Sequence, residues 1–287
     1  MKTSMALHMD YSHPYADSLA EKYGETLFHY TSISSFKGII DNKTLWLGNL
    51  KQMNDKSEQN HFIGLLQQAV NNRIADTVEP NAIKNFFKKV KTYRTQSNQY
   101  SFSFSRYSDD AAQWERYAVG ATGVCLGFDM VNLANLILGD PCTINEVFYG
   151  ERLDSHEHID NVCAFLKNGD LGSFASESSL ITNIVATSVS HKHPGFRSEN
   201  EVRLAYLFKT GPMKLEYKDC GGRIRQFLIL DLTEMGKKRG ITIEDLISTI
   251  TIGPRSGQDK EGLVDYLAEK GLLSLAGKVR VSDCPLR

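Results

Sequence analysis

A segment late in the chain alternates between charged and apolar side chains, and this alternation constrains the fold more than any other feature. The charged set is Glu199, Glu201 and Arg203, and the apolar set is Val202, Leu204 and Tyr206. A period of two is typical of a half-buried β-strand, whose successive side chains point to opposite faces. Two carboxylates on one face repel each other unless a cation or a substrate hydroxyl lies between them. The segment therefore predicts a strand carrying either a surface Glu–Arg ladder or part of a functional site.

Other segments mix strand and helix patterns without a strict order. Strands are predicted at 27–31, 45–47, 100–105, 122–128, 144–149, 199–206, 224–230, 250–255 and 278–282. Helices are predicted at 34–41, 109–117, 156–166, 177–189, 244–247 and 259–270, the first with Ser34 and Ser35 as N-cap candidates. The strict β-α-β alternation of a doubly wound sheet is missing, so the predicted class is α+β.

The segment from about 57 to 97 has a different period. Apolar residues recur there at helical spacing, with a break near Glu79-Pro80, which predicts two helices inserted into the fold. Residues 1–23 are polar and are expected to form an N-terminal arm, in which 17–23 is compatible with a short helix. The remaining residues, 24–287, are expected to form a single domain.

Composition limits the class of protein. The net charge of −1 provides no overall basic field for nucleic acid, although a local basic patch is compatible with it. No apolar run approaches the ~20 residues that cross a bilayer, and the first residues lack an apolar signal region. Five scattered cysteines form no Cys-x-x-Cys pair, which favours reduced thiols. These patterns predict a cytoplasmic protein without a membrane partner.

Four short motifs follow one another along the chain. They are His29-Tyr30-Thr31, Asn54-Asp55-x-x-Glu58, Phe104-Ser105 followed by Trp114-x-x-Tyr117, and Glu199-x-Glu201-x-Arg203. In this order they resemble a bacterial family of uncharacterised proteins. The His-x-Thr strand, the helix and strand after it, and the late glutamate also resemble the ADP-ribosyltransferase superfamily, over about residues 26–256. The resemblance implies a split, mixed β-sheet core and NAD as substrate.

The resemblance also implies roles for the late acidic motif. Glu201 would hold the 2-hydroxyl of the nicotinamide ribose, where a fixed negative charge stabilises an oxocarbenium-like centre. Glu199 would engage the acceptor. Arg203 would keep the carboxylates ionised or hold a phosphate of NAD.

The earlier motifs would supply the rest of the NAD site. His29 would bond the adenosine-side ribose, and Thr31, with its neighbour Tyr30, would lie near the nicotinamide amide. Tyr117 would supply an aromatic ring over nicotinamide, and Asn54 would contact NAD from its loop.

Each of these positions also has a simpler structural interpretation. His29 alone is compatible with a buried histidine bonded to a backbone carbonyl. Trp114 and Tyr117, three residues apart on a short helix, are compatible with core packing. Asn54 and Asp55 are compatible with forming the turn of their own loop. The serines of the 101–105 strand would support the cleft or face solvent.

Several other chemistries are excluded by the motifs. His156-x-His158 and His191-x-His193 lack a third ligand at a supportive spacing, so no metal site is predicted. The chain has no Gly-x-Gly-x-x-Gly fingerprint and no Walker loop, so an NAD site would not be of the Rossmann type. A Gly-x-Ser-x-Gly elbow is missing too, which leaves serine-hydrolase chemistry unsupported.

The expected function is therefore NAD-dependent ADP-ribosyl transfer to a macromolecule, with nucleic acid favoured over protein. A bacterial toxin or anti-phage effector, with an antitoxin or chaperone as a possible partner, fits that activity. Two alternatives stay open. One is a non-catalytic NAD- or nucleotide-binding sensor or docking module of the same fold, and the other is an NAD glycohydrolase.

Overall fold

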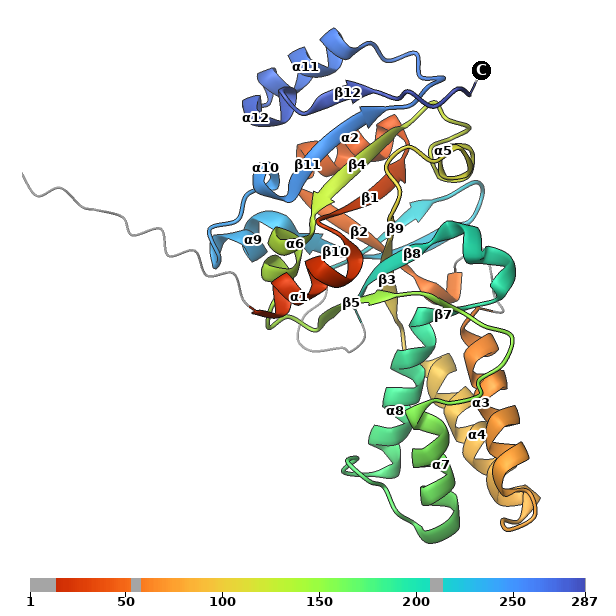
Figure 1. The fold of residues 1–287 in the computed structure, drawn as a ribbon. Helices are drawn as coiled ribbons and strands as arrows, with labels where there is room; N and C mark the ends of the chain where they lie inside the picture. Colours follow the sequence, from red (N-terminus) through yellow and green to blue (C-terminus); the bar gives the residue numbers. More distant parts are fainter. Residues whose placement is uncertain (1–13, 53–57, 207–213, 287) are drawn as a thin grey trace, which may run out of the picture.

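The structure is a computed structural model that describes residues 14–52, 58–206 and 214–286. Within these residues the chain forms an α+β body around one mixed sheet, and a four-helix unit that extends from it (Figure 1). The strands of the sheet are β1 (Thr26–Thr31), β2 (Thr44–Asn49), β3 (Tyr100–Ser105), β4 (Val124–Asp129), β5 (Cys142–Glu146), β8 (Glu201–Tyr206), β9 (Leu215–Asp219), β10 (Ile224–Asp231), β11 (Ile247–Ile252) and β12 (Val279–Val281). The expected α+β class is confirmed at this level.

The sheet forks at β3. One edge of β3 pairs along its whole length with β8, from Tyr100↔Tyr206 to Ser105↔Glu201. The other edge is shared, because β2 pairs only with Tyr100 and Ser101 and β1 pairs only with Ser105. Ser103 lies between the two partners. The backbone around Ser103 therefore faces a gap that another group must fill.

Helices cover the sheet and complete its core. They are α1 (Pro14–Tyr23), α2 (Ile33–Asn42), α5 (Ala111–Tyr117), α6 (Met130–Ile137), α9 (Leu232–Lys237), α10 (Ile243–Leu246), α11 (Lys260–Glu269) and α12 (Leu273–Ala276). The N-cap of α2 is Ser32, whose side chain accepts from the backbone N–H of Ser35, so Ser34 and Ser35 lie inside the first turn. Helix α6 was not expected from the sequence.

Helix α1 belongs to the body. Ala16, Leu19 and Tyr23 are buried in the main core, and α1 packs on α6. Residues 14–23 of the expected arm are therefore part of the body. Spacings of three and four residues put these side chains on one helical face, and α1 includes the segment 17–23 that was compatible with a short helix.

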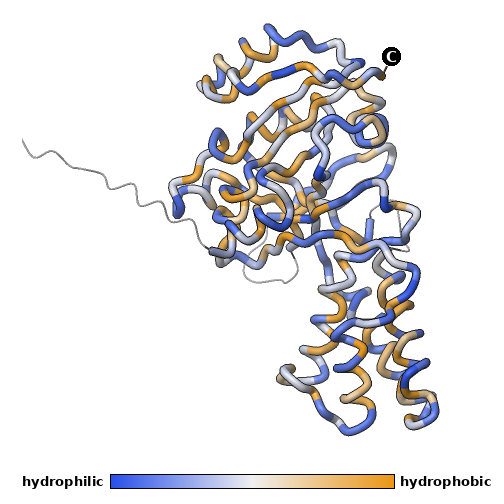
Figure 2. The backbone as a smooth tube through the Cα atoms, in the orientation of Figure 1, coloured by the Kyte–Doolittle hydropathy of each residue, from blue (hydrophilic) through white to orange (hydrophobic). Residues whose placement is uncertain are grey.

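The four-helix unit has its own core and comes from two distant parts of the sequence. Its helices are α3 (Glu58–Ile74), α4 (Pro80–Gln96), α7 (Glu157–Asn168) and α8 (Glu177–Thr187). The predicted insertion at 57–97, with its break at Pro80, accounts for α3 and α4. The other two helices pack on them around Phe62, Phe87 and Ile184. Hydrophobic and hydrophilic positions alternate along all four helices in Figure 2, as amphipathic packing requires.

Two strands differ from the sequence prediction for a physical reason. The segment predicted as one strand at 144–149 is divided into β5 and a short β6 (Phe148–Tyr149), which pairs with β7 (His191–Lys192). Strand β8 begins at Glu201 and pairs with β3 and β5 along its two edges. All six of its residues are buried, because Val202, Leu204 and Tyr206 pack into the main core on one face, and Lys192, Leu50 and Val189 pack against the other. The late strand is therefore central and not half-buried. None of the described helices has both the length and the apolar character needed to cross a membrane.

Candidate functional site

A pocket of about 100 Å³ opens beside the fork of the sheet. It is lined by His29 of β1, Ser103 and Ser105 of β3, residues of α5, Lys192 of β7, and the two glutamates of the late motif. The early imidazole and the late carboxylates therefore share one cavity, as the sequence motifs require for a common site. Two of the three serines in the 101–105 strand support this cleft.

The imidazole of His29 fills the gap in the fork. Its Nδ1 lies 2.9 Å from the Ser103 carbonyl oxygen, and its ring stacks on Phe102 at a centroid distance of 3.9 Å. A carbonyl only accepts, so Nδ1 carries the proton and Nε2 is left as an acceptor. Burial lowers the pKa of His29 to about 4, although the bond to Ser103 opposes this shift. The ring is therefore neutral near pH 7.

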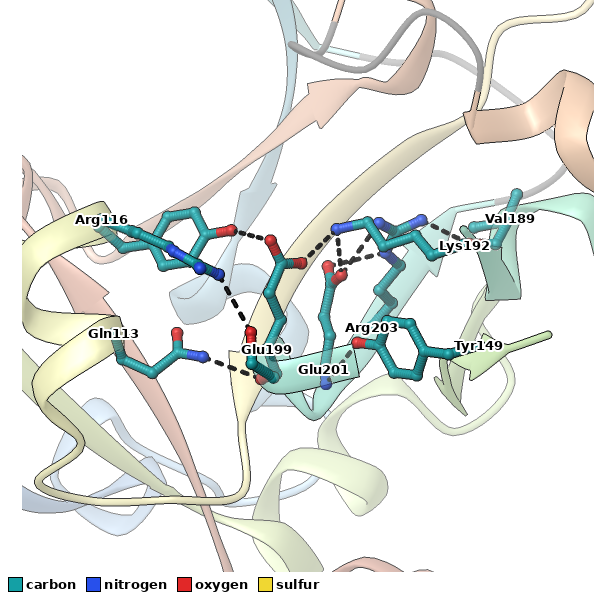
Figure 3. Close-up of polar contacts among 10 residues, drawn as sticks. Gln113, Arg116, Tyr149, Val189, Lys192, Glu199, Glu201 and Arg203 are labelled. Carbon is teal, nitrogen blue, oxygen red and sulfur yellow. Dashed lines mark hydrogen bonds and ion pairs between the residues drawn. The ribbon is translucent and has the colours of Figure 1, made fainter. Parts of the chain in front are cut away.

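The Glu199 and Glu201 carboxylates meet on the ammonium group of Lys192. Lys192 Nζ lies 2.6 Å from Glu199 Oε2 and 2.7 Å from Glu201 Oε2 (Figure 3). Both glutamates are buried, at 6% and 5% exposure. The lysine supplies the cation that two neighbouring carboxylates need.

The backbone that brings these carboxylates together is not a continuous strand. Glu199 ends the 3-10 helix η3 (Pro194–Glu199), and Asn200 takes the left-handed conformation with φ of 43°. Only then does β8 begin, at Glu201. The prediction of one strand from Glu199 was wrong because alternation also fits a helix end joined to a strand. Asn200 is one of the few residues that adopt this conformation at low cost.

Arg203 holds Glu201 from the other side. Its Nε and Nη2 donate to the two oxygens of Glu201 at 2.7 and 3.0 Å, and Nη1 donates to the Val189 carbonyl at 2.6 Å. Burial alone would raise the pKa of Glu201, but Arg203 and Lys192 together lower it to about 2. The expected pairing of Arg203 with a carboxylate is present. Arg203 is 1% exposed and is not among the described residues that line the pocket, so it acts through Glu201.

Helix α5 positions Glu199. The Tyr117 hydroxyl donates to Glu199 Oε1 at 2.6 Å, and Gln113 Nε2 donates to the Glu199 carbonyl at 2.9 Å. Burial and this bond raise the pKa of Tyr117. Tyr117 is 44% exposed and lines the pocket, whereas Trp114 is fully buried. The two aromatic residues of the motif thus divide between site and core.

The other residues predicted to bind NAD are Tyr30, Thr31 and Asn54, and they do not all lie at the pocket. Tyr30 also lines the pocket, but its hydroxyl is engaged in the loop before α5, where it donates to the Tyr107 carbonyl and accepts from the Asp110 N–H, both at 2.9 Å. Thr31 is buried and is not among the described pocket residues. Asn54 lies outside the residues that the structure describes.

Three residues of the site were not found by sequence reasoning. Lys192 lies on the two-residue strand β7, Gln113 lies within α5, and Tyr149 Oη accepts from the Glu201 N–H at 3.0 Å. The residues around Lys192 show no alternating or helical pattern that would have identified its position. The one available signal was the need of two adjacent carboxylates for a cation, which pointed to a partner without naming it.

The histidine pairs that were set aside as metal ligands lie near one another at the junction of β7 with α3 and α7. His156 and His191 have ring centroids 5.9 Å apart, and His158 Nε2 is bonded to Thr187 Oγ1. No group of three or more potential ligands with metal-binding geometry occurs among the described residues.

Comparison with known proteins gives one match. Residues 113–204 match a family model described as "Protein of unknown function (DUF2971)". The matched range runs from Gln113 to Leu204 and includes Tyr117, Lys192, both glutamates and Arg203, whereas His29 precedes it. Neither the curated proteins nor the solved structures give a match.

Proposed function

We propose that the protein is an NAD-dependent ADP-ribosyltransferase that modifies a macromolecule. The observation that supports this most is the presence of His29 and Glu201 in one pocket, with Glu199 beside them. The fork at β3 also fits the split sheet that the resemblance implies. These features support NAD as substrate, and the proposed acceptor is a nucleic acid or a protein.

The size of the pocket suggests which part of NAD it would take. Ligand pockets for whole drug-sized molecules are ≈ 300–1,000 Å³. A cavity of about 100 Å³ suits a single ring such as nicotinamide, and the rest of the dinucleotide would lie along the surface beside it. In this pose the exposed ring of Tyr117 would stack on nicotinamide, and His29 Nε2 would accept from a ribose hydroxyl.

The carboxylates would act as the glycosidic bond breaks. The C1′–N bond breaks with its electron pair leaving on nicotinamide, and positive charge develops on the ribose. Glu201 Oε1 accepts one bond, from Arg203, and Oε2 accepts two, from Arg203 and Lys192, so one lone pair on Oε1 is left and would accept the ribose 2-hydroxyl. The acceptor nucleophile then bonds to C1′ and gives its proton to Glu199.

The transfer is tested with adenylate-labelled NAD and three acceptors: single-stranded DNA, RNA and a bacterial protein extract. We expect label to appear in one acceptor, and Glu201→Gln to reduce it at least ~10²-fold. Tyr117→Ala is the second variant, because it changes an exposed side chain and leaves the buried ion pairs intact; it is expected to lower labelling ~10-fold. Labelling that both variants leave unchanged would exclude this site.

A second candidate is a module that binds NAD or a nucleotide without transfer. The charge balance of the cluster favours it, since Glu199 and Glu201 are matched by Lys192 and Arg203 and leave no net negative charge. Titration calorimetry with NAD distinguishes the candidates. Binding without labelled acceptor or free ADP-ribose supports the module, and free ADP-ribose without an acceptor supports NAD hydrolysis.

A further inference from the structure

Helix α4 has an unusual charge distribution. It carries Lys84, Lys88, Lys89, Lys91 and Arg94, and no acidic residue. Lys89 pairs with Glu177 of α8. Within the described residues, Lys84 and Lys88 are exposed and form no ion pair that would explain them as surface salt bridges.

A groove of about 660 Å³ runs along this helix. Its polar lining comes from Lys84, Lys88 and Lys91, with Asn81, Asn85 and Gln67 among their neighbours, and no carboxylate lines it among the described residues. Lys91 Nζ donates to Gln67 Oε1 of α3 at 2.9 Å, so its partner is a neutral amide. We call this surface the α4 groove.

The three lysines of the α4 groove repel one another. Lys84 and Lys88 are four residues apart and Lys88 and Lys91 are three apart, spacings that place neighbours on one helical face. At 1.5 Å per residue they extend over roughly 10 Å of the helix. Like charges at these spacings destabilise a helix unless an anion binds between them.

We propose that the α4 groove binds the sugar–phosphate backbone of a nucleic acid strand. A row of cations matches a polymer with regularly spaced phosphates, and amide side chains beside the lysines suit bonds to phosphate, sugar and base. A membrane surface fits poorly, because interfacial helices expose apolar side chains, whereas Phe87 in this groove is 1% exposed. The binding does not depend on NAD, so it stands or falls separately from the proposed transfer.

The test is fluorescence anisotropy of the full chain with a labelled 30-nucleotide single-stranded DNA, the same sequence as RNA, and a duplex. Measurements run from 50 to 200 mM salt without NAD. We expect Lys84→Ala/Lys88→Ala/Lys91→Ala to weaken binding at least ~10-fold at 50 mM salt and to reduce the slope of log K against log salt by ~2, since each lost phosphate contact contributes about 0.7 for a single strand. Lys→Arg at the same three positions should restore binding.

The matched control removes the same charge elsewhere. Lys167, Lys238 and Lys260 are exposed lysines outside the groove, and changing all three to Ala should leave the affinity within ~2-fold. Thermal melting confirms that both triple variants are folded. The proposal is overturned if wild-type protein binds none of the three nucleic acids, if both triple variants weaken binding equally, or if phosphatidylserine vesicles are bound and nucleic acid is not.

Discussion

The Glu201 carboxylate and the Arg203 guanidinium form a buried bidentate ion pair, with donor–acceptor distances of 2.7 and 3.0 Å. Breaking a buried pair leaves an uncompensated charge and costs about 3–5 kcal/mol. We therefore expect Glu201→Gln, which keeps the shape but loses the charge, to lower the free energy of unfolding by about 3 kcal/mol as well as the transfer rate. The burial of both side chains excludes the surface Glu–Arg ladder that the alternating pattern also allowed.

Urea unfolding measures the effect of Glu201→Gln. The control is Glu115→Gln, which breaks an exposed pair with Arg255 and should change the free energy of unfolding by less than about 1 kcal/mol. Equal effects of the two substitutions would contradict the importance of burial at Glu201.

Two substitutions at Tyr117 separate the contribution of its hydroxyl from that of its ring. Tyr117→Phe removes the 2.6 Å bond to Glu199 and keeps the exposed ring, whereas Tyr117→Ala removes both. If the ring stacks on nicotinamide, the affinity for NAD should fall by less than ~3-fold in Tyr117→Phe and by at least ~10-fold in Tyr117→Ala. The second value agrees with the free energy that an aromatic contact contributes. Calorimetry with NAD provides the measurement, and an equal loss in both variants would assign the effect to the hydroxyl.

Asn200 sets the angle between η3 and β8. Its φ of 43° is accessible to glycine and strained for a β-branched residue. We expect Asn200→Gly to leave the melting temperature nearly unchanged and Asn200→Val to destabilise the protein by about 1–2 kcal/mol. In Asn200→Val the transfer rate should fall by more than the decrease in the folded fraction accounts for, because Glu199 and Glu201 no longer converge on Lys192. Normal activity in that variant would show that the turn is not needed for the site.

Acid should destabilise the protein in two separate ranges. Burial lowers the pKa of His29, His158 and His191 to about 4, against an ordinary value of 6.5, so the unfolded chain binds protons first. Stability should therefore be constant above pH 7 and fall as the pH drops from 6.5 towards 4, by on the order of 1–2 kcal/mol per histidine at pH 5. Glu201, with a pKa of about 2, contributes stability that is lost only below pH 4.5.

Urea midpoints at pH 8, 7, 6 and 5 check the histidine range. A midpoint that stays constant between pH 7 and 5 would contradict the burial of these imidazoles in neutral form.

Gly123 allows a close approach to β1. A Cβ at this position would lie 2.0 Å from the Thr31 carbonyl oxygen, which is backbone and cannot move aside. Gly123→Ala should cost about 2 kcal/mol or more. Gly64 of α3 is the control, because a Cβ there meets nothing within 4 Å, and Gly64→Ala should stabilise the helix by about 0.5–1 kcal/mol. Differential scanning calorimetry of both variants should show melting temperatures shifted in opposite directions.

Local patterns were sufficient to predict most of the elements. Strand β3 lies at the predicted residues, and the break at Pro80 follows from the missing N–H of proline. The burial of β8 on both faces was not predictable, because it depends on distant residues such as Lys192, Leu50 and Val189 that pack on its polar face and not on its own alternation. The pairing of α7 and α8 with the predicted insertion is equally a matter of contacts between distant segments.

The residues of the site also fall into two groups, those that the sequence located and those that it missed. The motifs located the imidazole and both carboxylates, because chemistry requires those residue types and their order is visible in the sequence. Lys192 and Gln113 were missed, since their roles arise from a two-residue strand and a short helix that only the folded chain brings to the glutamates.

The fork at β3 makes the proposed transfer dependent on backbone pairing. Extending the β1–β3 ladder by two residues would satisfy Ser103 with a main-chain donor, displace the His29 ring and remove the space that it borders. Substitutions that extend the β1–β3 pairing would therefore remove the pocket. A relative in which these two strands pair along their whole length should have lost the proposed transfer activity and kept the fold.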